Sequence, residues 1–379
     1  MGRAPIIGNT LAWARQVSGL SVEELASAAN VKPERILQFE DNSSSPTFKQ
    51  LVKMAKKLDR TPAFFFTPAP TSPDIPSTID FRQSPELDGL DASTTKALRR
   101  AERYREIILE YADEAPTPTT LIKPFQRAGM KEAAEEIRSI FGIDSDFTPP
   151  GPSKEAGFKF WRQLLESHGI LVFQTSGVDR GVFRGLSVHH DVLPLILLNG
   201  NDFPSGKSFT LFHEVGHLIN RDSGLCMLEE ANNEEALANS FAAHFLMPEA
   251  AVRTQLSTAN EDAIGHIATT FKVSRIAAAI RLKDLGVTDE AAIQSEQARS
   301  DAAWKTEPDK LRNRDSGPAH WRIRYRDLGP TYVGTVARAL QEDRISVLDA
   351  SYFLDARIPV VDQLVRHYEQ GTESSKPAG

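Results

Sequence analysis

The segment Phe209–Asn220 contains the pattern His-Glu-x-x-His, and this pattern constrains the fold more strongly than any other stretch of the chain. Residues four apart lie on one face of an α-helix, so His213 and His217 can direct two imidazoles at one point. Two histidines supply most of the protein ligands of a catalytic Zn²⁺ site, where water takes the fourth position. Glu214 follows the first histidine, and its carboxylate can accept a proton from that water. The pattern therefore predicts a zinc site on a helix.

Apolar residues surround this motif, which indicates that the other faces of the helix are buried. They are Leu211, Phe212, Val215, Leu218 and Ile219. Polar groups on a buried helix need partners, because their desolvation is otherwise costly. A second helix is predicted at 232–248, with Asn232 or Asn233 as its N-cap and Pro248 at its end. We expect the missing ligand to come from this second helix.

Four acidic residues lie close enough in the sequence to supply the third ligand, namely Glu229, Glu230, Glu234 and Glu235. Helical periodicity separates these four candidates poorly. Asn239 favours Glu235, because it lies four residues further on, on the same face of the helix. From that position its amide could hold the histidines in place.

Together the two helical segments resemble the ImmA/IrrE-type metallopeptidases, which have a thermolysin-like zinc site on two helices. The first motif here is Phe209-Thr-Leu-Phe-His-Glu-Val-Gly-His217, and the second is Glu235-Ala-Leu-Ala-Asn-Ser-Phe-Ala-Ala-His-Phe-Leu-Met-Pro248. Phe212 stands where the family usually has alanine, which changes the packing beside the first histidine without touching a ligand. The resemblance covers residues 150–290.

The resemblance implies an activity as well as a site. It implies that the zinc ligands are His213, His217 and Glu235 and that the catalytic base is Glu214. Proteins of this type commonly bind a peptide as an added β-strand. Short apolar runs predict three strands, at 169–173, 185–188 and 192–198. The last of them, which ends at Asn199, is the expected peptide-binding strand. His189 and His190 could stabilise an oxyanion, although solvated loop positions are the simpler interpretation.

Residues 1–66 predict a separate all-α unit of short helices joined by tight turns. Ser21 and Glu24 have the spacing of a capping box at the start of a helix. Pro33 suits the first turn of the next helix, and a further helix is predicted at 47–58. Short helices with tight turns are typical of a helix-turn-helix domain.

This unit resembles the lambda-repressor/Cro-like (XRE) DNA-binding domains. The residues that carry the resemblance are Arg15, Gly19-Leu20-Ser21, Leu25-Ala26, Val31, Ile36, Glu40, Pro46 and Leu51. In that family an arginine on the first helix commonly pairs with a glutamate that ends the third. Arg15 and Glu40 stand in those places, and we expect them to form a structural salt bridge.

The recognition helix of such a domain would be Pro33–Phe39. The residues available to a major groove there are Lys32, Glu34, Arg35 and Gln38. Up to position 67 there are nine basic and six acidic residues in a chain of net charge −7, which favours a phosphate-facing surface. Val22 and the acidic Glu34 argue against DNA contact, so docking of a protein on the same fold remains open.

Proline-rich breaks divide the rest of the chain. The predicted parts are a linker at 67–80, a helical connecting region at 81–150, the catalytic domain at 151–290 and a C-terminal helical region at 291–379 with a disordered tail. The helices expected in these parts are 94–111, 131–141, 158–168, 332–341 and 347–354. The predicted fold class is therefore mostly α, with an all-α N-terminal domain and an α+β catalytic core on a small sheet.

Composition points to a reducing compartment and to no membrane span. The chain of 379 residues has one cysteine, Cys226, which excludes an intramolecular disulfide. No apolar run approaches the ~18 residues that a membrane span needs. A cytoplasmic protein is the natural expectation.

We therefore expect an intracellular zinc endopeptidase that cleaves a repressor protein and so regulates transcription during stress or mobile-element induction. The repressor is implied by the family resemblance alone. The alternative is a DNA-binding regulator whose zinc fold is a sensor or a structural module. Glu214 argues against that alternative, because a structural site needs no base.

Overall fold

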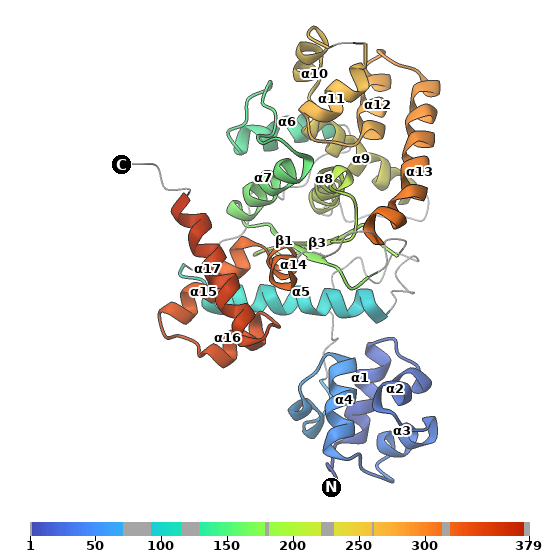
Figure 1. Ribbon diagram of the computed structural model, residues 1–379, viewed down its shortest axis with the longest axis vertical. Helices are drawn as coiled ribbons and strands as arrows, with labels where there is room; N and C mark the ends of the chain where they lie inside the picture. The colour runs from blue at the N-terminus through green and yellow to red at the C-terminus, as the bar shows by residue number, and fades with distance from the viewer. Residues whose placement is uncertain are drawn as a thin grey trace. The chain divides into compact units, whose positions relative to one another are not determined.

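The structure is a computed structural model that describes residues 2–70, 92–114, 129–178, 182–220, 231–259, 261–312 and 319–374. The chain is mostly helical with one small sheet, which confirms the predicted fold class (Figure 1). Its contacts divide it into two units, Met1–Arg103 and Tyr104–Gly379. Most of the predicted linker, Cys226, Glu229 and Glu230 lie outside the described residues.

Short helices with well-formed ends build the N-terminal unit. They are α1 Gly8–Val17, α2 Val22–Ala29, α3 Pro33–Glu40, α4 Phe48–Leu58 and the 3-10 helix η1 Pro62–Phe66, followed by the first part of α5 Ala92–Tyr111. The predicted capping box is present, because Ser21 and Glu24 each accept a hydrogen bond from the other's backbone N–H. Thr47 and Gln50 form a second capping box at the start of α4. These caps satisfy backbone donors that a helix cannot satisfy itself.

An ion pair between α1 and α3 lies largely inside this unit. Arg15 Nε donates to Glu40 Oε1 at 2.7 Å, and Arg15 Nη2 donates to Glu40 Oε2 at 2.9 Å. The remaining Nη1 donates to the carbonyl of Leu20 at 3.1 Å. The side chains are only 14% and 9% exposed, so each charge depends on the other for compensation. The predicted structural salt bridge is confirmed.

We expect the substitution Glu40→Ala to destabilise the N-terminal unit by roughly 2–4 kcal/mol, because it leaves the Arg15 charge without its partner. Hydrogen–deuterium exchange of the α1 and α3 amides measures this loss locally in the full chain. Glu34→Ala on the same helix removes an exposed acid and should change protection by no more than about 0.5 kcal/mol. Equal protection in the two variants would contradict a stabilising role for the pair.

The second unit contains a three-stranded sheet with the order β1–β3–β2. The strands are β1 Leu171–Thr175, β2 Gly185–Val188 and β3 Leu195–Asn199. β1 pairs parallel to β3, with Leu171 opposite Leu195, and β2 pairs antiparallel to β3. β3 starts later than its apolar run predicts, because Leu193 has a φ of 54° and Pro194 has no N–H to donate.

The expectation that the strand ending at Asn199 binds a peptide is wrong. β3 is the central strand and is paired on both sides, so its backbone groups are already used. An added strand needs an unpaired edge. An apolar run shows that a strand is buried but not which strands flank it, so the sequence left its neighbours undetermined.

Helices cover the sheet on both faces (Figure 1). On one face, α8 Pro204–Asn220 packs against β2 and β3, and α7 Lys154–Ser167 packs against β1 and α8. α9 Ala231–Leu246 packs against α8 on the side away from the sheet. On the other face, α14 His320–Leu328 packs against β1. α8 therefore lies between the sheet and α9.

The second unit contains further helices, some of which the sequence predicts. They are α6 Met130–Ile140, α10 Glu249–Leu256, α11 Ala263–Thr270, α12 Arg275–Asp284, α13 Glu290–Arg312, α15 Pro330–Gln341, α16 Val347–Phe353 and α17 Ile358–Ser374. α6, α15 and α16 correspond to the helices predicted at 131–141, 332–341 and 347–354, whereas α10, α13, α14 and α17 were not predicted. α13 is polar and rich in alanine. It therefore forms a helix because of the helix propensity of its residues, without the apolar stripe that would have predicted it. No described helix is long and apolar enough to cross a membrane.

Buried polar contacts attach the C-terminal helices to the sheet. Arg162 of α7 donates from Nη1 to the carbonyl of Arg326 in α14 at 2.6 Å. Glu166 accepts from Arg162 Nε at 2.8 Å and from the Thr331 hydroxyl of α15 at 2.6 Å. Gly329, with a φ of 85°, packs against the Arg162 guanidinium where a Cβ would not fit. These contacts make α14 and α15 part of the same unit as the sheet.

Candidate metal centre

Close packing of α8 on α9 brings the candidate ligands together. Gly216 lies between the two histidines of α8, and a Cβ at this position would be 2.9 Å from the Cα of Ala238 in α9. Such a contact is too short for carbon atoms, so a glycine is needed there. The two backbones can therefore approach closely, and a side chain near the start of α9 can reach the histidines.

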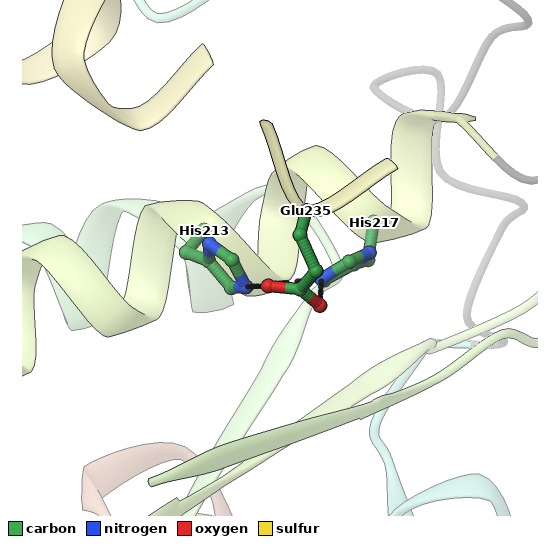
Figure 2. Close-up of side chains that lie close together, drawn as sticks. All are labelled: His213, His217 and Glu235. Atoms are coloured by element: carbon green, nitrogen blue, oxygen red, sulfur yellow. Dashed lines mark hydrogen bonds and ion pairs between the residues drawn. The ribbon is translucent and has the colours of Figure 1, made fainter. Parts of the chain in front are cut away.

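The side chains of His213, His217 and Glu235 converge on one point (Figure 2). The Nε2 atoms of His213 and His217 are 3.0 Å apart. Glu235 Oε2 lies 3.3 Å from His213 Nε2, and Glu235 Oε1 lies 3.2 Å from His217 Nε2. In the described part of the chain, these residues form the cluster with the spacing of a metal site. Glu229 and Glu230 lie outside the described residues, and of the two acidic candidates that the structure describes, Glu235 and not Glu234 is placed with the histidines.

The separations fit a single metal ion. A tetrahedral ion with bonds of about 2.0–2.1 Å separates its ligand atoms by roughly 3.3 Å. The three ligand-atom separations, from 3.0 to 3.3 Å, are close to that value. The Glu235 side chain is 61% exposed, so the cluster is open to solvent on that side.

The charges within the cluster favour an ionised carboxylate. Hydrogen bonds with His213 and then His217 hold the pKa of Glu235 well below its usual range. Burial lowers the pKa of His213, but its hydrogen bond with Glu235 and the charge of Glu214 outweigh burial and raise the pKa overall. Glu235 is therefore ionised at neutral pH, and an ionised carboxylate is the form that binds a metal.

Asn239 fixes the orientation of one histidine. Its Oδ1 lies 3.0 Å from His213 Nδ1. An amide oxygen only accepts, so Nδ1 carries a proton, and Nε2 is the ring nitrogen that faces the cluster and can bind a metal once it is deprotonated. His244 lies outside the cluster, as expected from its position on α9, and its Nδ1 is 2.8 Å from the carbonyl of Ser240.

Glu214 lies beside the cluster with its carboxylate turned towards β2. The residue is only 6% exposed, and burial raises the pKa of its carboxyl group. The charges of His217 and His213 and a hydrogen bond from Ser187 act in the opposite direction. Sequence reasoning did not single out Ser187 or Gly185, which both lie on the β2 face towards α8. The alternation of side chains along a strand predicts that Gly185 and Ser187 share one face. It does not predict that this face contacts Glu214.

The candidate DNA-contacting residues lie on and just before α3. Lys32 and Glu34 are exposed, whereas Arg35 and Gln38 are partly buried. Arg35 Nη1 donates to Gln38 Oε1 at 2.7 Å, and its guanidinium lies over the Phe39 ring at 5.2 Å from the ring centre. The side chains of Arg35 and Gln38 are therefore held together. Their role in DNA contact stays a prediction.

Comparison with protein families supports this reading of both regions. Residues 165–283 match the family described as the IrrE N-terminal-like domain, which is a peptidase family, and residues 11–65 match a helix-turn-helix family. The chain combines a helix-turn-helix domain with an IrrE N-terminal-like domain. The resemblances inferred from the two sets of motifs are thus confirmed.

Similarity to individual proteins is weaker. A solved Mycobacterium tuberculosis transcriptional regulator matches 48% of the chain at 15% identity, with a TM-score of 0.31. The match spans 51% of that regulator, so the chain covers about half of its length. No curated protein matches the chain.

We expect Glu235→Ala to weaken metal binding by more than roughly 100-fold, because removal of a ligand should exceed the 10–100-fold effect of changing a residue that supports one. Elemental analysis after dialysis and competition with a chelator measure the change. The control is Glu234→Ala, the adjacent carboxylate, which should keep the wild-type metal content. Unchanged binding in Glu235→Ala would place the third ligand elsewhere.

Proposed function

We propose that this protein is a zinc-dependent endopeptidase with a DNA-binding helix-turn-helix domain, and that it regulates transcription by cleaving a repressor protein. The observation that carries the proposal is the convergence of His213, His217 and Glu235 within ligand distance. Two imidazoles and one carboxylate with an open fourth position are typical of catalytic zinc. The match to the IrrE N-terminal-like family supports peptidase chemistry.

The residues around the cluster suit hydrolysis of a peptide bond. Zinc bound there would supply a Lewis acid that lowers the pKa of water and polarises the peptide carbonyl. Glu214 takes a proton from the attacking water and delivers it to the leaving amine nitrogen. Glu214 is buried next to His213, so its carboxylate lies close to the water that a bound metal would hold. Asn239 keeps His213 Nε2 directed at the cluster.

The outer edge of β2 suits the peptide. β2 is an edge strand that lies against α8, and among the described residues its backbone pairs with β3 on one side only. A peptide that adds to this edge would gain main-chain hydrogen bonds while its scissile bond lies near Glu214. β2 thus replaces the central strand as the proposed acceptor.

The helix-turn-helix match supports a protein substrate that works at DNA. A peptidase attached to such a domain can be concentrated near a promoter, or it can dock on a repressor of the same kind. A second candidate function is DNA-binding regulation in which the metal site serves as a sensor, and the same match favours it. Glu214 distinguishes the two, because a sensor site has no use for a buried base.

We expect Glu214→Gln to keep wild-type zinc content and to lower the cleavage rate by at least about 10⁴-fold, because the amide cannot accept the proton. Purified wild type and variant are compared for zinc and for cleavage of the repressor encoded nearest the gene. Zinc in both with cleavage in wild type alone supports the peptidase. A variant that derepresses its promoter as wild type does would exclude proteolysis as the function.

If α3 contacts DNA, the salt dependence of DNA affinity should change in variants of its exposed residues. Lys32→Ala should weaken binding to all sequences and lower the slope of log K against log salt by about 0.9, because one phosphate contact is lost. Gln38→Ala should instead alter sequence preference, by roughly 1–3 kcal/mol at one base pair. Fluorescence anisotropy over a salt series measures both, with Lys131→Ala as a control outside the N-terminal unit. Wild-type behaviour in both variants would show that α3 is not the reading helix.

A further inference from the structure

The strand β2 lies directly against the helix that carries the candidate base. Successive side chains of a strand point to opposite faces, so Gly185 and Ser187 share one face and Leu186 and Val188 share the other. Gly185 and Ser187 both contact α8 through Glu214. Val188 is buried on the opposite face.

Gly185 leaves the space that the Glu214 carboxylate occupies. A Cβ at position 185 would lie 2.6 Å from Glu214 Oε1 and 2.9 Å from Glu214 Cγ. It would also lie 2.8 Å from Cγ2 of Thr210, one turn earlier on α8. These separations are well below ordinary van der Waals contact, so any side chain would displace Glu214 or the strand. Gly185 does not have a positive φ, so it is the available space and not the backbone conformation that requires glycine.

Ser187 supplies a polar contact on the same carboxylate. Ser187 lies two residues after Gly185, on the same face of the strand, and its hydroxyl interacts there with the Glu214 carboxylate. Glu214 is buried, so water competes weakly for this contact. Glu214 therefore touches β2 at two points, the backbone at position 185 and the side chain at 187.

We propose that β2 positions the catalytic base, with Gly185 providing the space for the Glu214 carboxylate and Ser187 holding that carboxylate by a hydrogen bond. This inference rests on the proposed peptidase function. Gly185 and Ser187 are positioning residues, because both act through Glu214. The edge proposed to bind the peptide and the element that orients the base are then one strand, so a shift of β2 changes both together.

Steady-state kinetics of the full chain test the Ser187 contact. Loss of one hydrogen bond to a carboxylate should lower kcat of Ser187→Ala by about 10-fold, with KM and zinc content unchanged. Ser187→Thr keeps the hydroxyl and suits a strand, so it should recover kcat to within about 3-fold of wild type. Lys131→Ala removes an exposed side chain on α6, away from β2 and the metal cluster, so it is the control and should leave kcat unchanged.

The substitution Gly185→Ala tests whether the Glu214 carboxylate needs the space beside position 185. Displacement of a catalytic group by about 1 Å can cost roughly 100-fold, so kcat should fall on that order while zinc stays bound. A higher KM with an unchanged kcat would instead show that Gly185 contributes to peptide binding and not to the position of the base. That outcome would overturn the steric part of the proposal.

A second measurement needs no substrate. Thermal unfolding of zinc-saturated wild type, Ser187→Ala, Glu214→Ala and the double variant forms a double-mutant cycle. If Ser187 contacts Glu214, the midpoint shift of the double variant should be clearly smaller than the sum of the single shifts. Additive shifts would overturn the Ser187 contact even before a substrate is found.

The peptidase function and the positioning role of β2 can be tested separately. Cleavage by Glu214→Gln at the wild-type rate would overturn the proposed function. Cleavage that depends on Glu214 but is unaffected by Ser187→Ala and by Gly185→Ala would overturn the positioning role of β2 and leave the proposed function standing.

Discussion

The close approach of α8 to α9 is the constraint on which the candidate site depends. Gly216 allows it, since a side chain there would collide with the backbone at Ala238. At this separation the Glu235 carboxylate reaches His213 and His217, and all three ligand atoms come within the spacing of one ion. A wider separation would leave the histidines paired on α8 and the carboxylate in solvent. Helix–helix packing, more than any single polar contact, therefore sets the geometry of the cluster.

The sheet plays the corresponding role for Glu214. α8 lies between α9 and the sheet, so one helix presents its histidines to α9 and its glutamate to β2. β2 lies against the glutamate and, among the described residues, pairs on one side only, which is why it is the proposed peptide acceptor. Buried contacts of Arg162 with the C-terminal helices join α14 and α15 to the β1 side of the same sheet. The second unit is thus one packed structure in which α8 is central.

Local rules account for much of the fold. Capping boxes at Ser21 and Thr47 are formed by residues three apart, so they depend on little outside the segment. The alternation along one segment also placed β2 at the predicted residues 185–188, although not its partner strand. The predictions of secondary structure were wrong where the hydrophobic pattern is weak or where backbone conformation and distant segments determine the structure. The polar helix α13 has little apolar stripe to predict it, and β3 is shortened by the conformation of Leu193.

By itself the sequence determined that His213 and His217 share one face of a helix, because a spacing of four is a property of the helix alone. It also determined that two unlike units occur in the chain, since each has its own motifs. Tertiary structure decided that Glu235 joins the histidines, because that depends on how closely α8 and α9 approach. It also decided that, among the described residues, β2 is an edge strand beside Glu214 whereas β3 is paired on both sides. Strand order and helix separation are contacts between distant segments, and the spacing of residues along one segment does not contain them.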